Sequence, residues 1–203
     1  FDDPKVGAVT ASVLVKQRNN LLELLQAVEY KIIGFTRKLL GMIEAIYVTP
    51  GPLAVYRKEA FDKVGRFDES NLTEDIEITW AIVSAGYKVE MSLKSEVYSV
   101  APSKVSEWFK QRLRWNIGGI QTMFKYANHF SKKGRLRSFI LPFFLFSWSI
   151  ALFGIMVLLY RLIRMFIIRY LSTIYSIQAE TAILRLSDIN LTPNILIFLG
   201  GLV

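Results

Sequence analysis

The feature that most constrains this chain is an uncharged apolar run from Phe139 to Tyr160, "FILPFFLFSWSIALFGIMVLLY". As a helix rising about 1.5 Å per residue, the run spans roughly 33 Å, enough to cross the hydrocarbon core of a bilayer. Pro142 falls in the first turn, where a helix tolerates proline. We therefore predict a membrane crossing at about 139–160. It is followed by arginines that can reach a lipid interface: Arg161, Arg164 and Arg169.

The composition also favours a membrane protein. Apolar residues make up 52% of the chain, although its formal net charge is +8. A basic balance suits nucleic acid, anionic lipid or phosphorylated substrates. The high apolar content favours the membrane, and we expect no nucleic-acid partner because no basic stripe with interleaved aromatic residues occurs. The chain has no cysteine, which excludes disulfides and thiolate metal sites.

Three parts are expected along the chain. Residues 1–102 alternate strand and helix patterns, 103–138 hold an amphipathic helix and a basic connector, and 139–203 form a membrane region. The last apolar run, from about 193, fits the start of a second crossing. Because the chain begins at Phe1 and stops inside that run, we expect it to be a piece of a longer protein.

Local patterns predict the elements of residues 1–102. β-Branched runs indicate strands, helical spacing of apolar residues indicates helices, and glycines mark helix ends. Asn19 or Asn20 is expected to cap the first helix, and Thr73 the third. The expected strands are at 6–15, 87–93 and 96–100, with strand, turn and strand over 47–57. The expected helices are at 21–46, 58–65 and 73–86.

The segment "SEWFKQRLRWNIGGIQ" predicts a helix with two different sides, within a helix from 103 to about 127. Gln111, Arg114 and Trp115 are spaced i, i+3, i+4 and share one side. An amide, a guanidinium fork and a flat ring suit a diphosphate and a sugar. A surface helix with ordinary charges explains the same spacing. The other side is apolar and suits lipid or a core: Phe109, Leu113, Ile117, Ile120 and Phe124.

The segment "NLTEDIE" places two carboxylates, Glu74 and Asp75, in the first turn of the helix that starts at Thr73. A carboxylate there can take a proton from an attacking hydroxyl. The helix N-terminus favours the charged form, whereas burial raises the pKa. Acids that complement a helix dipole are common, so both interpretations stand on this motif alone. His129, in the basic connector, is expected to be solvated.

Together the motifs resemble the membrane-bound processive members of glycosyltransferase family 2, such as the cellulose, chitin, hyaluronan and poly-N-acetylglucosamine synthases. Thr73-Glu74-Asp75 matches the family's Thr-Glu-Asp motif, and Gln111 with Arg114-Trp115 matches its Gln-x-x-Arg-Trp motif. The resemblance covers roughly residues 3–125. It implies an α/β fold, namely the second half of a GT-A-type glycosyltransferase domain followed by an interface helix and a transmembrane helix.

The resemblance also implies roles. Asp75 would be the general base for the acceptor hydroxyl, Glu74 would shape the site, and Thr73 belongs to the same catalytic motif. Arg114 and Gln111 would contact the nucleotide diphosphate. Trp115 would stack near the acceptor sugar. The acceptor channel would be lined by Gly51, Pro52 and Leu53. The family's amphipathic helix lies at the membrane surface and walls the active site, which accounts for its two sides.

The family's nucleotide-binding half, with an Asp-x-Asp metal site, is expected upstream of Phe1. Asp2 and Asp3 are adjacent to each other and are not read as that site. A divalent metal, Mg or Mn, is therefore expected in the full-length enzyme, with its ligands outside this chain. The expected partners are a nucleotide sugar, of the UDP type, a polysaccharide or lipid acceptor, and the membrane.

The expected function is inverting, processive transfer of a HexNAc-type sugar to a growing polysaccharide, by a multi-pass cell-membrane protein with a cytoplasmic catalytic part. Cations before the crossing support a cytoplasmic N-terminal side, although Arg161 and Arg164 beyond it weaken that signal. These cations are Lys132, Lys133, Arg135 and Arg137. The alternatives are a single-transfer lipid glycosyltransferase and a non-catalytic membrane subunit. By itself this fragment is expected to be inactive.

Overall fold

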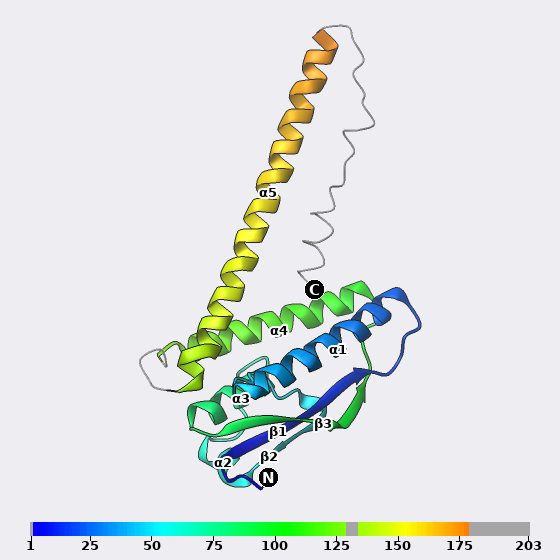
Figure 1. Cartoon of the computed structure of the whole chain (residues 1–203). Helices are drawn as coiled ribbons and strands as arrows, with labels where there is room; N and C mark the ends of the chain where they lie inside the picture. The colour runs from blue at the N-terminus through cyan, green and yellow to red at the C-terminus, as the bar shows by residue number, and fades with distance from the viewer. Residues whose placement is uncertain (1, 129–133, 179–203) are drawn as a thin grey trace. The chain divides into compact units, whose positions relative to one another are not determined.

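The computed structural model describes residues 2–128 and 134–178, and these form parts of two compact units, 1–144 and 145–203 (Figure 1). His129, Lys132, Lys133 and the expected second crossing from about 193 lie outside the described residues. The first unit is a mixed α/β structure with one sheet. The described part of the second unit is the continuation of one long helix.

The sheet has three strands in the order β2-β1-β3. Strand β1 (Val6–Val15) is central, antiparallel to β2 (Ala54–Tyr56) and parallel to β3 (Lys88–Ser99). Its β-branched, largely buried sequence suits a central position. The two strands expected at 87–93 and 96–100 are one strand, β3. A register shift opposite Ala11 and Ser12 separates its two halves.

Helix α1 (Leu21–Met42) begins where the sequence predicts. Asn20 Oδ1 accepts a hydrogen bond from Glu23 N at 2.8 Å, and Glu23 Oε2 accepts one from Asn19 N at 2.7 Å. The helix ends before the expected Ile46 because the chain turns at Glu44, whose φ is 56°. That turn buries the following residues in the core.

The expected strand at the start of 47–57 is absent, whereas β2 is confirmed. The backbone N–H and C=O groups of this segment bond side chains of helix α3 (Glu74–Ser84) instead of a neighbouring strand. Trp80 Nε1 donates to Tyr47 O at 3.1 Å, and Thr49 N donates to Thr79 Oγ1 at 2.9 Å. Side chains of a helix therefore replace the sheet partner that a strand would need.

The two shorter helices of the first unit follow the sequence prediction. Helix α2 (Lys58–Lys63) and helix α3 both end at a glycine with positive φ, Gly65 and Gly86. Helix α3 is buried on all sides over residues 77–82, and Trp80 is fully buried in the core. The Trp80 ring meets the Phe144 ring edge-on, with centroids 5.2 Å apart.

Helix α4 (Val105–Lys125) is the predicted amphipathic helix, and Figure 1 shows it lying beside α1. A π-helical turn (Leu136–Ile140) leads into α5 (Leu141–Gln178), with Pro142 in the first turn. By length and composition, 136–176 is one helix able to cross a membrane. The region after the predicted crossing is thus a helical extension of it.

Candidate active site at the junction of helices α3 and α4

The start of α3, at Thr73, packs on α4 at Gly118, three residues after Trp115. A Cβ placed on Gly118 would lie 2.8 Å from the Thr73 Cβ and closer still to its hydroxyl, so only glycine permits this approach. The buried Thr73 occupies the N-cap position but makes no capping bond. Its hydroxyl donates to Asn71 Oδ1 at 3.3 Å. Thr73 therefore acts here as a packing residue against α4.

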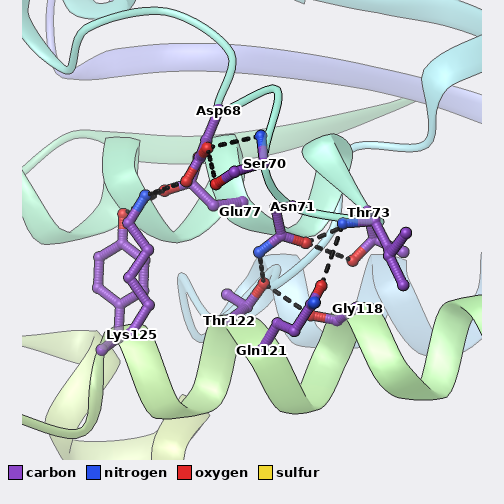
Figure 2. Close-up of polar contacts among 11 residues, drawn as sticks. Asp68, Ser70, Asn71, Thr73, Glu77, Gly118, Gln121, Thr122 and Lys125 are labelled. Atoms are coloured by element: carbon purple, nitrogen blue, oxygen red, sulfur yellow. Dashed lines mark hydrogen bonds and ion pairs between the residues drawn. The ribbon is translucent and has the colours of Figure 1, made fainter.

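Hydrogen bonds hold the loop before α3 against α4, as Figure 2 shows. Asn71 Nδ2 donates to Thr122 Oγ1 at 3.0 Å, and Leu72 N donates to Gln121 Oε1 at 3.1 Å. Thr122 Oγ1 also donates to Gly118 O at 3.0 Å, within α4. The contact between the two helices is therefore both tight and polar.

Beyond that contact, the buried Glu77 forms a polar cluster with the end of α4 (Figure 2). Lys125 Nζ lies 2.6 Å from Glu77 Oε1 and 2.7 Å from Asp68 Oδ2. Tyr126 Oη donates to Glu77 Oε1 at 2.9 Å. Hydrogen bonds from Lys125 and Ser70 lower the pKa of Asp68 to about 2. Glu77 thus joins α3 to the end of α4, and Asp68 joins the loop before α3 to Lys125.

Asp75 has a different environment in the first turn of α3. Its side chain is half-buried, and burial raises the pKa of its carboxyl. The Ile76 N–H donates to Asp75 Oδ1 at 2.9 Å and opposes that rise, as does the charge of Arg114, while the neighbouring Glu74 adds to it. Among the described residues, no Lys or Arg lies within 4 Å of this carboxylate. Glu74 itself is exposed.

The segment that contains Gly51–Leu53 lies beside Asp75. Thr49 Oγ1 is 2.8 Å from both the Tyr56 and Thr79 hydroxyls, and it donates to Asp75 O at 3.5 Å. The negative charges of Asp75 and Glu74 contribute to a raised pKa of Tyr56, although burial is the larger cause. Gly51–Leu53 is an exposed 3₁₀ turn between these anchors. The turn is thus flanked by Thr49, which bonds the Asp75 backbone carbonyl, and by Tyr56, on which the Asp75 charge acts.

The three predicted site residues of α4 differ in their exposure to solvent. Arg114 is exposed, whereas Gln111 and Trp115 are half-buried. Gln111 Oε1 is buried and accepts no hydrogen bond within the described part of the chain. The Arg112 guanidinium carbon lies 4.2 Å from the Trp115 ring centroid, so one face of that ring already carries a cation.

Sequence reasoning missed two arginines of this region. Arg112 forms a short ion pair, 2.5 Å, with Glu29 of α1, and burial raises the pKa of that glutamate despite the pair. Arg37 of α1 is 7% exposed, and its Nε has no hydrogen-bond partner in the described residues. Burial lowers the pKa of Arg37, and the charges of Tyr47 and Asp75 raise it. The sequence carries no signal for either one, because Arg112 lies among the other cations of α4 and Arg37 lies on the side of α1 opposite its apolar residues.

No metal-binding group occurs in the described residues, in the sense of three or more His, Cys, Asp or Glu side chains brought together. Asp75 and Glu74 are the acids at the α3 N-terminus, and the nearby Glu77 is occupied by Lys125 and Tyr126.

Comparison with known proteins identifies the family of the chain. Residues 1–186 match the model of glycosyl transferase family group 2, and the chain therefore belongs to that family. It is 28% identical over 142 residues to the poly-beta-1,6-N-acetyl-D-glucosamine synthase of Staphylococcus aureus (strain COL), covering 70% of this chain and 34% of that protein. The synthase of Staphylococcus epidermidis matches with the same identity and coverage. The chain spans about a third of the length of these relatives.

Proposed function

We propose that this chain is the acceptor side of a membrane enzyme that transfers a sugar from a nucleotide-sugar donor to a growing polysaccharide. The family supports transfer from an activated sugar. The names of the relatives support a HexNAc-type sugar and a polymeric product. A UDP-linked donor, an inverting and processive reaction, and a multi-pass membrane protein with a cytoplasmic catalytic part belong to the same proposal.

The observation that carries the proposal is the environment of Asp75. A half-buried carboxylate with a raised pKa and no cation within ion-pair distance among the described residues is suited to accept a proton. The acceptor hydroxyl attacks the anomeric carbon of the donor, and its proton passes to Asp75. The bond from that carbon to the diphosphate oxygen breaks, and the diphosphate leaves with the electron pair. Configuration at the anomeric carbon is inverted in this single displacement.

Helix α4 supplies the other groups of the proposed site. The exposed Arg114 presents a fork of donors that suits a diphosphate. The unpaired Gln111 Oε1 is an acceptor for a donor group of the substrate. The Trp115 face not covered by Arg112 remains for the acceptor sugar. The turn of Gly51, Pro52 and Leu53 would line the acceptor path beside Asp75.

A divalent metal belongs to the proposal for the whole enzyme, as in the family, with ligands outside this chain. When bound, such an ion neutralises charge on the leaving diphosphate. Within this chain, the described residues bind and orient the acceptor and remove its proton. The fold of 1–102 is proposed to complete a GT-A-type domain together with the nucleotide-binding half.

The test compares Asp75→Asn with Glu74→Gln in the full-length protein, measuring sugar transfer in membranes at matched expression. Loss of a general base lowers rates by about 10²–10⁴-fold, so Asp75→Asn should lose transfer to that extent. Glu74→Gln changes a residue that is proposed to shape the site without taking the proton, so it should lose much less transfer than Asp75→Asn. Near-normal transfer by Asp75→Asn would refute the assignment. Analysis of the product separates polymer from singly glycosylated lipid.

A further inference from the structure

A cavity lies at the end of α3 that is far from the candidate active site. Its volume of about 380 Å³ falls in the range of small-molecule sites, about 300–1,000 Å³. Ser84, the last residue of α3, lines the cavity, whereas Asp75 lies in the first turn of the same helix. At about 1.5 Å per residue, roughly 14 Å of helix separates the two. The cavity is therefore distinct from the proposed transfer site.

Four cations from three separate segments line this cavity. Lys5 directly precedes β1, Lys88 begins β3, and Arg135 and Arg137 lie at the π-helical turn before α5. Among the described residues that line it, Glu44 is the only acid. A hollow with such an excess of positive charge concentrates anions from solution.

Glu44 bridges two of the four cations. Its Oε1 pairs with Lys88 Nζ, and its Oε2 lies 3.6 Å from Arg135 Nε. The left-handed φ of 56° at Glu44 is uncommon outside glycine. The hydrogen bond with Glu44 raises the pKa of Lys88, and the charges of Asp3 and Glu90 add to that rise. Lys88 and Arg135 are thus held at the cavity wall in their charged forms.

The other two cations have no acidic partner. Neither Lys5 nor Arg137 forms an ion pair within the part of the chain that the structure describes. The Lys88 N–H donates to Lys5 O at 2.7 Å, so these two lysines stand on neighbouring strands. Like charges on adjacent strands repel each other. An anion bound between the cations would offset that repulsion.

We propose that this cavity binds a phosphate-bearing ligand through its four cations. A phosphate group carries the negative charge and the acceptor oxygens that lysine and arginine side chains bind. The apolar part of the ligand would contact the rest of the lining, which includes Val83, Tyr87 and Leu136. This inference does not depend on the proposed transfer reaction.

Two sources can supply such a ligand. The π-helical turn leads directly into the candidate membrane-crossing helix, so the headgroup of an anionic phospholipid is one source. A soluble phosphate compound is the other. Both present the same phosphate chemistry to the cavity, and the two arms of the test separate them.

The test compares two double variants of the full-length protein that lose the same charge. The cavity variant combines Lys5→Gln with Arg137→Gln, and the control combines Lys58→Gln with Lys94→Gln, neither of which lines the cavity. All four side chains are exposed and form no ion pair within the described residues. Folding should therefore be undisturbed in both variants.

The first arm uses inorganic phosphate, with the protein in detergent. Its binding is measured as a rise in unfolding temperature at constant ionic strength, because a ligand of the native state stabilises it. Phosphate bound near Arg114 would shift both variants alike. The second arm raises the fraction of phosphatidylglycerol in phosphatidylcholine nanodiscs and counts the phosphatidylglycerol retained on the protein by native mass spectrometry.

In at least one arm, the cavity variant should bind the probe about tenfold or more weakly than the control, because each charge-assisted hydrogen bond contributes about that factor. A loss confined to phosphatidylglycerol identifies the lipid headgroup as the source, and a loss of inorganic phosphate identifies a soluble ligand. Equal binding by the two variants in both arms would overturn the proposal.

Glu44→Gln is a second variant with the opposite expected sign. It removes the carboxylate that repels an anion and frees Lys88 and Arg135 to bind it. We expect severalfold tighter binding of the probe to which the cavity responds. If this variant instead weakens binding as the cavity variant does, then the charge of the cavity does not govern binding, and the proposal is wrong.

Discussion

Helix α3 carries two carboxylates only two positions apart, Asp75 and Glu77, and their surroundings differ. Glu77 is buried and satisfied by Lys125 and by the Tyr126 hydroxyl. Asp75 is half-buried, receives one backbone N–H, and has a raised pKa because burial outweighs its neighbours. A carboxylate with strong partners holds two helices together, whereas one with few partners retains affinity for a proton. Glu77 is therefore a structural residue, and Asp75 is the one proposed to react.

The largest stability effect in this comparison is expected for Glu77→Ala. The change leaves the Tyr126 hydroxyl without its acceptor and removes one of the two carboxylates that bind Lys125. We expect a loss of about 3 kcal/mol, from two hydrogen bonds that involve charge. Thermal unfolding of the full protein in detergent measures it, with the exposed Glu74→Ala as control. A stable Glu77→Ala protein that has lost transfer would reverse the roles assigned to the two carboxylates.

Gly118→Ala tests whether the close packing of α4 on Thr73 is what brings the charge of Arg114 to act on Asp75. A methyl group would meet Thr73, so the helices must separate. Such overpacking should cost about 1–2 kcal/mol after the better helix propensity of alanine is included. Transfer should also fall.

The neighbouring Gly119→Ala is a matched control for that change. Its Cβ meets only a Phe144 ring atom at 3.9 Å, an ordinary contact. Both variants add one methyl group to the same helix and gain the same propensity. If the two variants show equal stability and equal transfer, then the close contact between Gly118 and Thr73 contributes to neither property.

A smaller effect with a definite sign is expected from Asp75→Asn on stability. Because the pKa of Asp75 is raised in the folded protein, the native state binds this proton more tightly than the unfolded chain. The contribution of Asp75 to the free energy of unfolding is therefore full below the ordinary carboxyl pKa of 3.8. It is lost as the pH rises through the higher pKa of the folded protein. At neutral pH the asparagine variant should unfold at a higher temperature than the parent, and the gap should shrink on acidification. A less stable variant at neutral pH would show that ionised Asp75 is well compensated.

The smallest effect is expected from Arg37→Met, which removes a buried positive charge near Asp75. Without that charge the ionised carboxylate is less favoured, so the pKa of Asp75 should rise further. The acid limb of the pH–rate profile for transfer should move to higher pH. Arg37→Lys keeps the charge and should restore the parent profile. An unmoved limb in Arg37→Met would mean that Arg37 does not act on this carboxylate.

Interactions between neighbouring residues determined the positions of many of the helices and strands. The β-branched run of β1, the Asn20 cap of α1, the glycines after α2 and α3, and the uncharged run of α5 each specify their element through neighbouring residues alone. The two motifs of the candidate site were visible for the same reason, because each lies within one helix. Their roles in the reaction stay predictions.

Tertiary structure decided what depends on residues far apart in the chain. The segment before β2 is not a strand because side chains of α3 bind its backbone, and β3 is continuous because it pairs along the whole of β1. The sequence also could not predict which side of α1 is exposed, because the spacing of its apolar residues fits burial and exposure equally well. Which side faces outward was settled by the partners of its polar side, Pro102 and Arg112, which lie more than seventy residues away. Periodicity defines the two sides of a helix, and only the contacts made on folding decide which one is covered.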